Sequence, residues 1–331
     1  MGISVIICTH NGSKKIEFAL HSLISQSFIG EWELIVVNNN SSDDTIQVCT
    51  KILAQSNLDW KIVNEFKIGL SHARLRGIME SNYDILLFCD DDNALSIGYL
   101  DHGYVQMNNN PQIGAIGGCG IPVIEKEAPQ WFLKYSHSYA VGPQGVADGI
   151  LDSSKAELYG AGVFMRKAPL LKLWKCGIEP ILTGRIGGKL MAGEDIELCY
   201  LLQYMGYNLA YESNLTFYHQ ITQQRLTWEY YIELKSGIAF SSALLFSYKG
   251  VLENPIWSDR KFMLQYSKLF IFNFLILAKL FVVSIAKPAP DSQLNKAVYK
   301  SKVQSYMLNF FKSFRHFRLL KKHHSALNGE K

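Results

Sequence analysis

Three consecutive aspartates, Asp90, Asp91 and Asp92, follow the apolar run "ILLFC" (85–89). Like charges about 4 Å apart repel by roughly 4 kcal/mol at the effective dielectric near a protein surface, so such a run needs a compensating cation. Carboxylates are ligands of Mg²⁺ and Mn²⁺, which also bind the phosphates of a substrate. The run therefore predicts a site for a divalent cation and a phosphate-bearing substrate; an acidic turn without a metal is the alternative. Because side chains alternate along a strand, Asp90 and Asp92 are predicted to face the ligand, and Asp91 to brace the turn.

A second pair of carboxylates, Glu194 and Asp195, follows Gly193 in "MAGEDIELCYLLQYMGY" (191–207). The apolar spacing after the pair predicts a helix that begins there and ends before Gly206. A carboxylate at such a position could act as a general base that takes the proton of an attacking hydroxyl, and Asp195 is the candidate for this role. The alternative is that anionic side chains merely stabilise the start of the helix.

Three weaker signals accompany these carboxylates. The loop "LTGRIGGKL" (182–190) carries Arg185 and Lys189, which would offset the charge of a leaving group if the loop closes over the site; a plain flexible loop is the alternative. His219 ends an alternating apolar run and is either a metal ligand or a core histidine. Trp131 is either a platform for a sugar ring or, as the default, a core side chain.

Strand-like and helix-like segments alternate over the first ninety residues. The strand-like runs are "ISVIIC" (3–8), "ELIVVN" (33–38), "KIVNEF" (61–66) and "ILLFCD" (85–90), and the helix-like segments begin near Ser13 and cover 43–55 and 70–81. This order is typical of an α/β fold with a doubly wound, mostly parallel sheet. Ligands bind outside the carboxyl ends of such strands, so the polar clusters 9–11, 38–44 and 90–92 are predicted to meet at one edge. Ordinary turn formation is the alternative for each cluster.

The motifs, taken in order, resemble those of the family 2 glycosyltransferases. They are "SVIICTHN", "ELIVVNNNSSDDT", "GLSHARLRGI", "ILLFCDDDN", "GAGVFMRK" and "GEDIELCYLLQYMGY", and they extend over roughly residues 3–220. The resemblance implies the GT-A fold and inverting transfer of a sugar from a nucleotide diphosphate donor. It also implies Mn²⁺ or Mg²⁺ as cofactor.

The resemblance assigns roles to individual residues of this chain. The nucleotide and the sugar donor would be bound by Thr9, His10, Asn11, Asn38, Arg74 and Asp90. Asp91 is grouped with these donor-site residues, although its side chain is the one predicted to brace the turn. The metal would be bound by Asp92 and His219, and Asp195 would be the general base.

Two positions depart from the family pattern. Asn38 stands where the family usually has an aspartate that accepts a hydrogen bond from the nucleobase. This difference weakens the case for uridine, although a UDP-sugar remains the favoured donor. Leu75 stands where the family has an asparagine, in Ala73-Arg74-Leu75-Arg76-Gly77.

Composition separates an acidic body from a basic tail. The chain has 331 residues, 48% of them hydrophobic, and a net charge of +4. Residues 287–331 carry ten Lys and Arg and two Asp and Glu, so the rest of the chain has a net charge of −4. The six cysteines form no C-x-x-C pair and indicate buried, reduced thiols rather than disulfides or a zinc site. The first residues show no basic or cleavable segment, which predicts no secretory signal.

The C-terminal third is helical and apolar in pattern. Residues 269–286 are apolar, but Lys279 and Asn273 bring the expected free energy of insertion close to zero, so a helix lying in the membrane interface fits as well as a spanning one. The tail 305–324 combines aromatic residues at helical spacing with lysines and arginines, which favours an anionic membrane surface over nucleic acid. A helix packed on the catalytic domain is the alternative.

The sequence thus predicts a GT-A catalytic domain at 1–222 and a helical, membrane-associating region at 223–331. The expected function is metal-dependent transfer of a sugar to a glycan or lipid-linked acceptor in surface polysaccharide biosynthesis, on the cytoplasmic face of a bacterial inner membrane. A sugar nucleotidyltransferase is one rival, although "CTHNGSKK" has only one glycine where that class needs a glycine-rich loop. A binding module with a degenerate site is the other. The donor sugar and the oligomeric state stay open.

Overall fold

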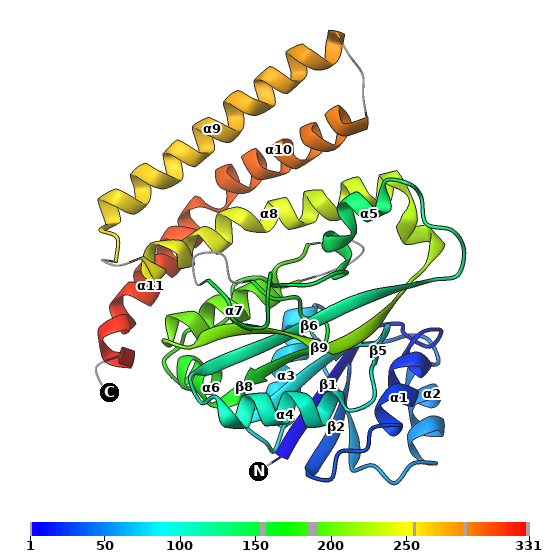
Figure 1. The fold of residues 1–331 in the computed structure, drawn as a ribbon. Helices are drawn as coiled ribbons and strands as arrows, with labels where there is room; N and C mark the ends of the chain where they lie inside the picture. The colour runs from blue at the N-terminus through cyan, green and yellow to red at the C-terminus, as the bar shows by residue number, and fades with distance from the viewer. Residues whose placement is uncertain (1, 153–156, 185–190, 254–255, 287–289, 329–331) are drawn as a thin grey trace.

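The computed structural model of the chain describes residues 2–152, 157–184, 191–253, 256–286 and 290–328. An α/β part built on one nine-stranded sheet carries a stack of long C-terminal helices on one side (Figure 1). The strands are β1 (Gly2–Thr9), β2 (Glu31–Asn38), β3 (Trp60–Asn64), β4 (Ile85–Asp90), β5 (Asn93–Leu95), β6 (Ile113–Ile124), β7 (Gly149–Ile150), β8 (Val163–Arg166) and β9 (Asn208–Ile221). The α-helices are α1 (Ile16–Ile24), α2 (Thr45–Leu53), α3 (Leu70–Glu80), α4 (Tyr99–Asn109), α5 (Phe132–Tyr135), α6 (Lys167–Lys175), α7 (Glu194–Tyr204), α8 (Trp228–Leu252), α9 (Asp259–Ala286), α10 (Pro290–Leu308) and α11 (Phe310–Asn328). Two 3₁₀ turns, η1 (Ser136–Tyr139) and η2 (Gln223–Leu226), complete the set.

Half of the sheet is parallel, as the alternation of strands and helices predicted. The strands follow the order β3-β2-β1-β4-β8-β6-β9-β5, and the first four of them pair in parallel. Their register places Thr9 beside Asn38, and Cys8 beside Asp90. The polar residues that follow β1, β2 and β4 therefore meet at one edge of the sheet.

The other half of the sheet is mixed, which the sequence did not predict. The short strand β8 lies antiparallel between β4 and β6, and β5 and β7 run antiparallel to β9. The long strands β6 and β9 are parallel to each other. This arrangement matters for the site because β9 carries His219 to the position opposite Asn93, next to the aspartate run.

Both faces of the sheet are buried. On β1, Ile3, Val5 and Ile7 pack in one core with residues of α1, α2 and α4. Ile6 faces a second core that also contains residues of α3, α6, α7, α8 and α11. Burial on both faces explains why the strand reads as a continuous apolar run.

The C-terminal helices form successive layers over the α/β part. Helix α8 lies nearest to it, α10 packs on α8, and α9 is outermost (Figure 1). The predicted tail helix at 305–324 is instead two helices, because α10 ends at Leu308 and α11 begins at Phe310.

The aromatic residues of this tail mostly face protein. Phe317 is fully buried, with its ring stacked 4.5 Å from that of Phe262. Phe310 lies 5.2 Å from Tyr266, and only Phe311 among these tail aromatics is highly exposed. The packing alternative therefore holds for most of the tail, since helical spacing looks the same for an aromatic that meets a neighbouring helix and for one that meets lipid.

Helix α9 is the element with an exposed apolar face. Its large apolar side chains Ile271, Phe272, Phe274, Leu275, Phe281 and Val282 are all more than half exposed. In the described part of the chain it is the one helix that is long and apolar enough to cross a membrane, judged by length and composition alone.

Candidate active site

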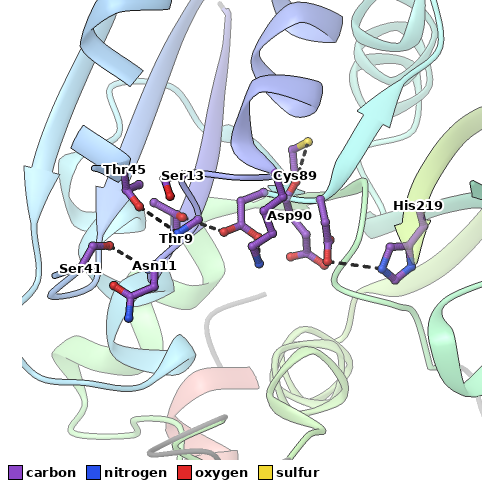
Figure 2. Close-up of polar contacts among 12 residues, drawn as sticks. Thr9, Asn11, Ser13, Ser41, Thr45, Cys89, Asp90 and His219 are labelled. Atoms are coloured by element: carbon purple, nitrogen blue, oxygen red, sulfur yellow. Dashed lines mark hydrogen bonds and ion pairs between the residues drawn. The ribbon is translucent and has the colours of Figure 1, made fainter. Parts of the chain in front are cut away.

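A cavity of about 740 Å³ opens at the edge of the sheet where the parallel strands end. Its walls come from the ends of β1 and β4, from α3, from residues 137–140 and 157–161, from the start of α7, and from β9, η2 and α8. Eight of the ten predicted site residues line it, and seven of these are Thr9, His10, Arg74, Asp90, Asp91, Asp92 and Asp195. An eighth, His219, lines it as well and reaches from β9 toward the aspartate run (Figure 2).

Asp91 is held by two contacts and is 6% exposed. The Thr9 hydroxyl donates a hydrogen bond to it at 2.6 Å, and the Lys15 amino group forms an ion pair with its other oxygen at 2.7 Å. Burial would lower the pKa of Lys15, but the charge of Asp91 outweighs this effect and raises it. Asp91 thus joins the loop after β1 to the end of β4, which is the bracing role predicted for the middle aspartate.

Asp90 is the most accessible carboxylate of the run. Its side chain is 36% exposed, and its nearest described cation is the Arg74 guanidinium at 3.7 Å. The same guanidinium lies 3.6 Å from Glu194 at the start of α7. Arg74 is buried between the two carboxylates, so it joins the aspartate run to the helix that carries Asp195.

Asp92, His219 and Arg225 form a compact group. The Asp92 Oδ2 lies 3.6 Å from His219 Nε2, and the Arg225 Nη1 lies 2.9 Å from the former and 3.2 Å from the latter. His219 Nδ1 is 2.7 Å from the Tyr139 carbonyl oxygen and must donate to it, so a neutral ring presents the lone pair of Nε2 to Asp92 and Arg225.

The chemistry of this pair suits a divalent cation that is completed by phosphate oxygens. Among the described residues no group of three or more His, Cys, Asp and Glu side chains is placed to hold a metal. One carboxylate and one imidazole remain, and Mg²⁺-type sites commonly add substrate phosphates to one or two protein ligands. Asp92 and His219 therefore fit the protein side of such a site.

Asp195 faces the cavity from the first turn of α7, as predicted. Gly193 has φ +114°, a left-handed conformation that lets the chain turn into the helix. The two Asp195 carboxylate oxygens accept hydrogen bonds from the backbone N–H groups of Gly160 at 2.9 Å and Ile196 at 2.8 Å. A Cβ at position 160 would lie 2.1 Å from the Arg74 guanidinium, so glycine lets the chain pass between Arg74 and Asp195.

The helix that carries Asp195 is anchored by Glu197. This fully buried carboxylate accepts hydrogen bonds from the backbone N–H groups of Ile181 and Leu182 and from the Tyr248 hydroxyl of α8. Burial raises its pKa to about 7. Glu197 thus fixes α7 relative to α8 and to the chain that enters the 182–190 loop; Arg185 and Lys189 of that loop lie outside the described residues.

Two predicted site residues do not line the cavity. The Asn38 amide donates to Asn64 at 2.9 Å and accepts from the Ser41 backbone N–H at 3.0 Å. The Asn11 side chain accepts from the Ser42 backbone N–H at 2.8 Å and so ties two loops together. The cavity is lined instead by Asn39, whose carbonyl oxygen accepts from His10 at 2.8 Å.

Trp131 packs in an aromatic cluster, 5.3 Å from Trp228 and 5.4 Å from Tyr231. It does not line the cavity. Trp131 is therefore a core side chain, which was the default interpretation.

The sequence interpretation missed Lys15, Arg225 and Lys235, which line the cavity. Lys15 and Arg225 contact the aspartate run, and Lys235 projects from α8. No sequence pattern identifies these residues as site residues, because only the tertiary structure brings them next to the cavity. The one available signal is that Arg225 follows His219 closely in "HQITQQR".

Known sequences resemble parts of this chain. Residues 4–174 match the sequence model of glycosyl transferase family 2. Poly-beta-1,6-N-acetyl-D-glucosamine synthase of Staphylococcus epidermidis is 28% identical over 118 residues, which are 35% of this chain and 28% of that protein. Glucosyl-dolichyl phosphate glucuronosyltransferase of Haloferax volcanii is 20% identical over 237 residues, which are 70% of this chain and 73% of that protein.

Solved structures share the fold over nearly the whole chain. TarS residues 1–349 of S. aureus in complex with UDP-GlcNAc superposes with a TM-score of 0.52 at 17% identity, covering 98% of this chain and 92% of that one. The mannosyltransferase PcManGT of Pyrobaculum calidifontis in complex with GDP-Man and Mn²⁺ gives a TM-score of 0.55 at 15% identity, covering 97% and 86%. The family match extends over slightly more than half of the chain, and it agrees with the arrangement of the cavity. The chain belongs to glycosyl transferase family 2.

Proposed function

We propose that the protein transfers a sugar, with inversion and with the help of a divalent cation, from a nucleotide diphosphate donor to an acceptor hydroxyl. The observation that carries the proposal is that Asp195 and the aspartate run, which are far apart in the sequence, line one cavity. The complexes of TarS with UDP-GlcNAc and of PcManGT with GDP-Man and Mn²⁺ support a nucleotide sugar as donor. We retain a UDP-sugar as the favoured donor.

The donor would lie along the edge of the sheet. Thr9 and His10 border the nucleotide side of the cavity, and Asp90 is the carboxylate free to meet the ribose or the metal. A divalent cation held by Asp92 and His219 would neutralise the diphosphate as it leaves. Arg74 supplies a fixed positive charge beneath Asp90.

The transfer step needs a base, and Asp195, which lines the cavity at the start of α7, would supply it. The acceptor oxygen forms a bond to the anomeric carbon as the bond from that carbon to the diphosphate oxygen breaks, and the hydroxyl proton passes to the Asp195 carboxylate. The backbone N–H groups of Gly160 and Ile196 fix the orientation of the carboxylate and leave further lone pairs for this proton.

The acceptor side of the cavity touches the C-terminal helices through Leu234, Lys235 and Ile238 of α8. Lys235 lies near Lys302, and this pair of lysines would favour an anionic group on the acceptor; burial and Lys302 lower the pKa of Lys235. Together with the apolar face of α9, this supports a lipid-linked glycan acceptor on the cytoplasmic face of a bacterial inner membrane. Poly-beta-1,6-N-acetyl-D-glucosamine synthase among the relatives supports a place in surface polysaccharide biosynthesis.

A panel of nucleotide sugars with Mn²⁺ tests the donor and the reaction type. The expected result is release of a nucleoside diphosphate from one donor, with UDP-sugars tried first, and faster release when a lipid-linked acceptor is added. The measurement is chromatography of the nucleotide products. Release of pyrophosphate would instead identify a nucleotidyltransferase, and no turnover and no binding with any donor would identify a degenerate binding module.

Membrane binding is tested on the exposed face of α9. Replacing Phe272 and Leu275 together by aspartate is expected to lower partitioning into anionic vesicles at least about 100-fold, because burial of two such side chains is worth about 3 kcal/mol or more. Flotation with vesicles of phosphatidylglycerol and phosphatidylethanolamine measures the bound fraction. The exposed Lys268 and Lys279 of the same helix predict weaker binding when phosphatidylglycerol is omitted.

The matched control replaces two exposed isoleucines of the α/β part, Ile29 and Ile97, which are 99% and 80% exposed. Their double aspartate variant is expected to float like the wild type. Equal flotation of the α9 variant and the control, or a wild type that stays with the soluble fraction, would reject the membrane surface.

A further inference from the structure

A guanidinium nitrogen lies between the two side chains that fit a metal. Arg225 Nη1 is within hydrogen-bond distance of both Asp92 Oδ2 and His219 Nε2, at 2.9 and 3.2 Å. These two atoms are 3.6 Å apart, so a cation bound to both would lie between them. Mg²⁺ lies about 2.0–2.1 Å from its ligands, which leaves no room for the Arg225 nitrogen in the same place.

The tautomer of His219 allows either cation to bind. Its Nδ1–H donates to the Tyr139 carbonyl, so Nε2 has a free lone pair that accepts from Arg225 now and would coordinate a metal equally well. Asp92 likewise offers one carboxylate oxygen to both partners. The two binding states therefore use the same two atoms and exclude each other.

Arg225 is held in a way that permits its release. One nitrogen, Nη1, makes both contacts to the pair, and the buried Nε has no hydrogen-bond partner among the described residues. The backbone at this position is fixed, since the Tyr139 hydroxyl donates to the Arg225 carbonyl at 2.9 Å. Movement would thus be confined to the side chain, which lines the cavity where the diphosphate would lie.

We propose that Arg225 is the resident counter-cation of Asp92 and His219, which a divalent metal displaces, and that the displaced guanidinium then binds the donor diphosphate. This inference rests on the metal-assisted transfer proposed above. Without nucleotide, the metal must break the Arg225 contacts with no compensation. With nucleotide, the guanidinium gains phosphate partners, so metal and nucleotide bind cooperatively through this residue.

Binding of Mn²⁺ alone, followed by electron paramagnetic resonance of the free ion, tests the competition. The glutamine variant Arg225→Gln keeps a hydrogen-bond donor but removes the charge, and it is expected to bind Mn²⁺ at least about 10-fold more tightly than the wild type without nucleotide, which corresponds to about 1.4 kcal/mol. Arg225→Lys, which keeps the charge, is expected to stay closer to the wild type.

Cooperativity with nucleotide gives the second readout. Saturating UDP, or GDP in parallel, is expected to tighten Mn²⁺ binding several-fold more in the wild type than in Arg225→Gln. Asp92→Asn serves to identify the site, because it should abolish the Mn²⁺ signal. Arg76→Gln is the matched control on an exposed arginine of α3, and it should leave both readouts unchanged.

The outcomes separate the two proposals. Unchanged or weaker Mn²⁺ binding by a folded Arg225→Gln variant overturns the competition, while nucleoside diphosphate release by the wild type leaves the proposed transfer standing. If the wild type releases nucleoside diphosphate but binds no Mn²⁺ with or without nucleotide, the inference and the metal requirement both fall. If it neither releases nucleoside diphosphate nor binds nucleotide, the proposed function fails first.

Discussion

Replacing Asp195 by asparagine is expected to lower the rate constant of sugar transfer by about 10²–10⁴-fold, the usual contribution of a positioned general base. The amide cannot take up the acceptor proton near neutral pH. The affinity for the nucleoside diphosphate is expected to stay within about twofold, because the Asp195 carboxylate accepts its hydrogen bonds from the backbone N–H groups of Gly160 and Ile196 and not from the side chains assigned to the donor.

The variant has a small structural cost that must be measured separately. One carboxylate oxygen becomes an NH₂ group that faces a backbone N–H, which costs about 1–3 kcal/mol for the unsatisfied contact. Thermal unfolding therefore accompanies the kinetics, and titration calorimetry with UDP or GDP reports donor-site integrity.

The matched control for this prediction is Asp101→Asn, another aspartate in the first turn of a helix, α4, that does not line the cavity. It is expected to transfer sugar at the wild-type rate. If Asp195→Asn keeps more than a tenth of the wild-type rate constant and the same dependence on pH, Asp195 is not the base, and the geometry offers Glu194 as the next candidate on the same turn.

The sequence was sufficient to predict the half of the sheet that forms the site. A parallel strand buried on both faces has to be apolar throughout, so β1, β2 and β4 could be read as continuous runs. Parallel strands also end at the same edge, which is why the meeting of residues 9–11 with the aspartate run followed from chain order. Those two rules placed Asp90, Asp91 and Asp92 correctly at the cavity.

The mixed half of the sheet followed no such rule. The strands β5, β7 and β8 have between two and four residues each, too few for a period-2 pattern to stand out. Their pairing is decided by β4, β6 and β9, which lie far away in the sequence. The same reason hid the pairing of β9 that matters most, which is with β5 directly after the aspartate run and sets His219 opposite Asn93.

The sequence also did not predict the individual side-chain contacts within the site. The position of Asn38 after β2 led to its assignment as a contact of the donor's nucleobase. In the structure its amide side chain instead forms hydrogen bonds with Ser41 and Asn64, the polar groups that the fold brings near it. Lys15 and Arg225 were overlooked because surface-type side chains give no pattern until their carboxylate partners are placed beside them. The nucleotide-binding roles of Asn38 and Asn11 remain predictions.

Replacing Arg74 by methionine is expected to lower the free energy of unfolding by about 3–5 kcal/mol, the cost of removing one partner from buried charges. The Arg74 side chain is 5% exposed, and its guanidinium lies within 4 Å of both Asp90 and Glu194. Methionine fills a similar volume, so the loss reports charge rather than a cavity. Chemical denaturation followed by circular dichroism measures it, and donor affinity is expected to fall as well because Asp90 loses its neighbour.

Helix α3 supplies its own control, because Arg76 lies two residues away and forms an ion pair with Glu80 at 2.8 Å while its side chain is 44% exposed. Arg76→Met is expected to cost no more than about 1 kcal/mol, since exposed ion pairs contribute little. If the two variants lose equal stability, the charge of Arg74 does not hold the aspartate run and α7 together. If Arg74→Met is instead more stable than the wild type, the buried charge of Arg74 destabilises the fold. Its role would then be to bind the donor.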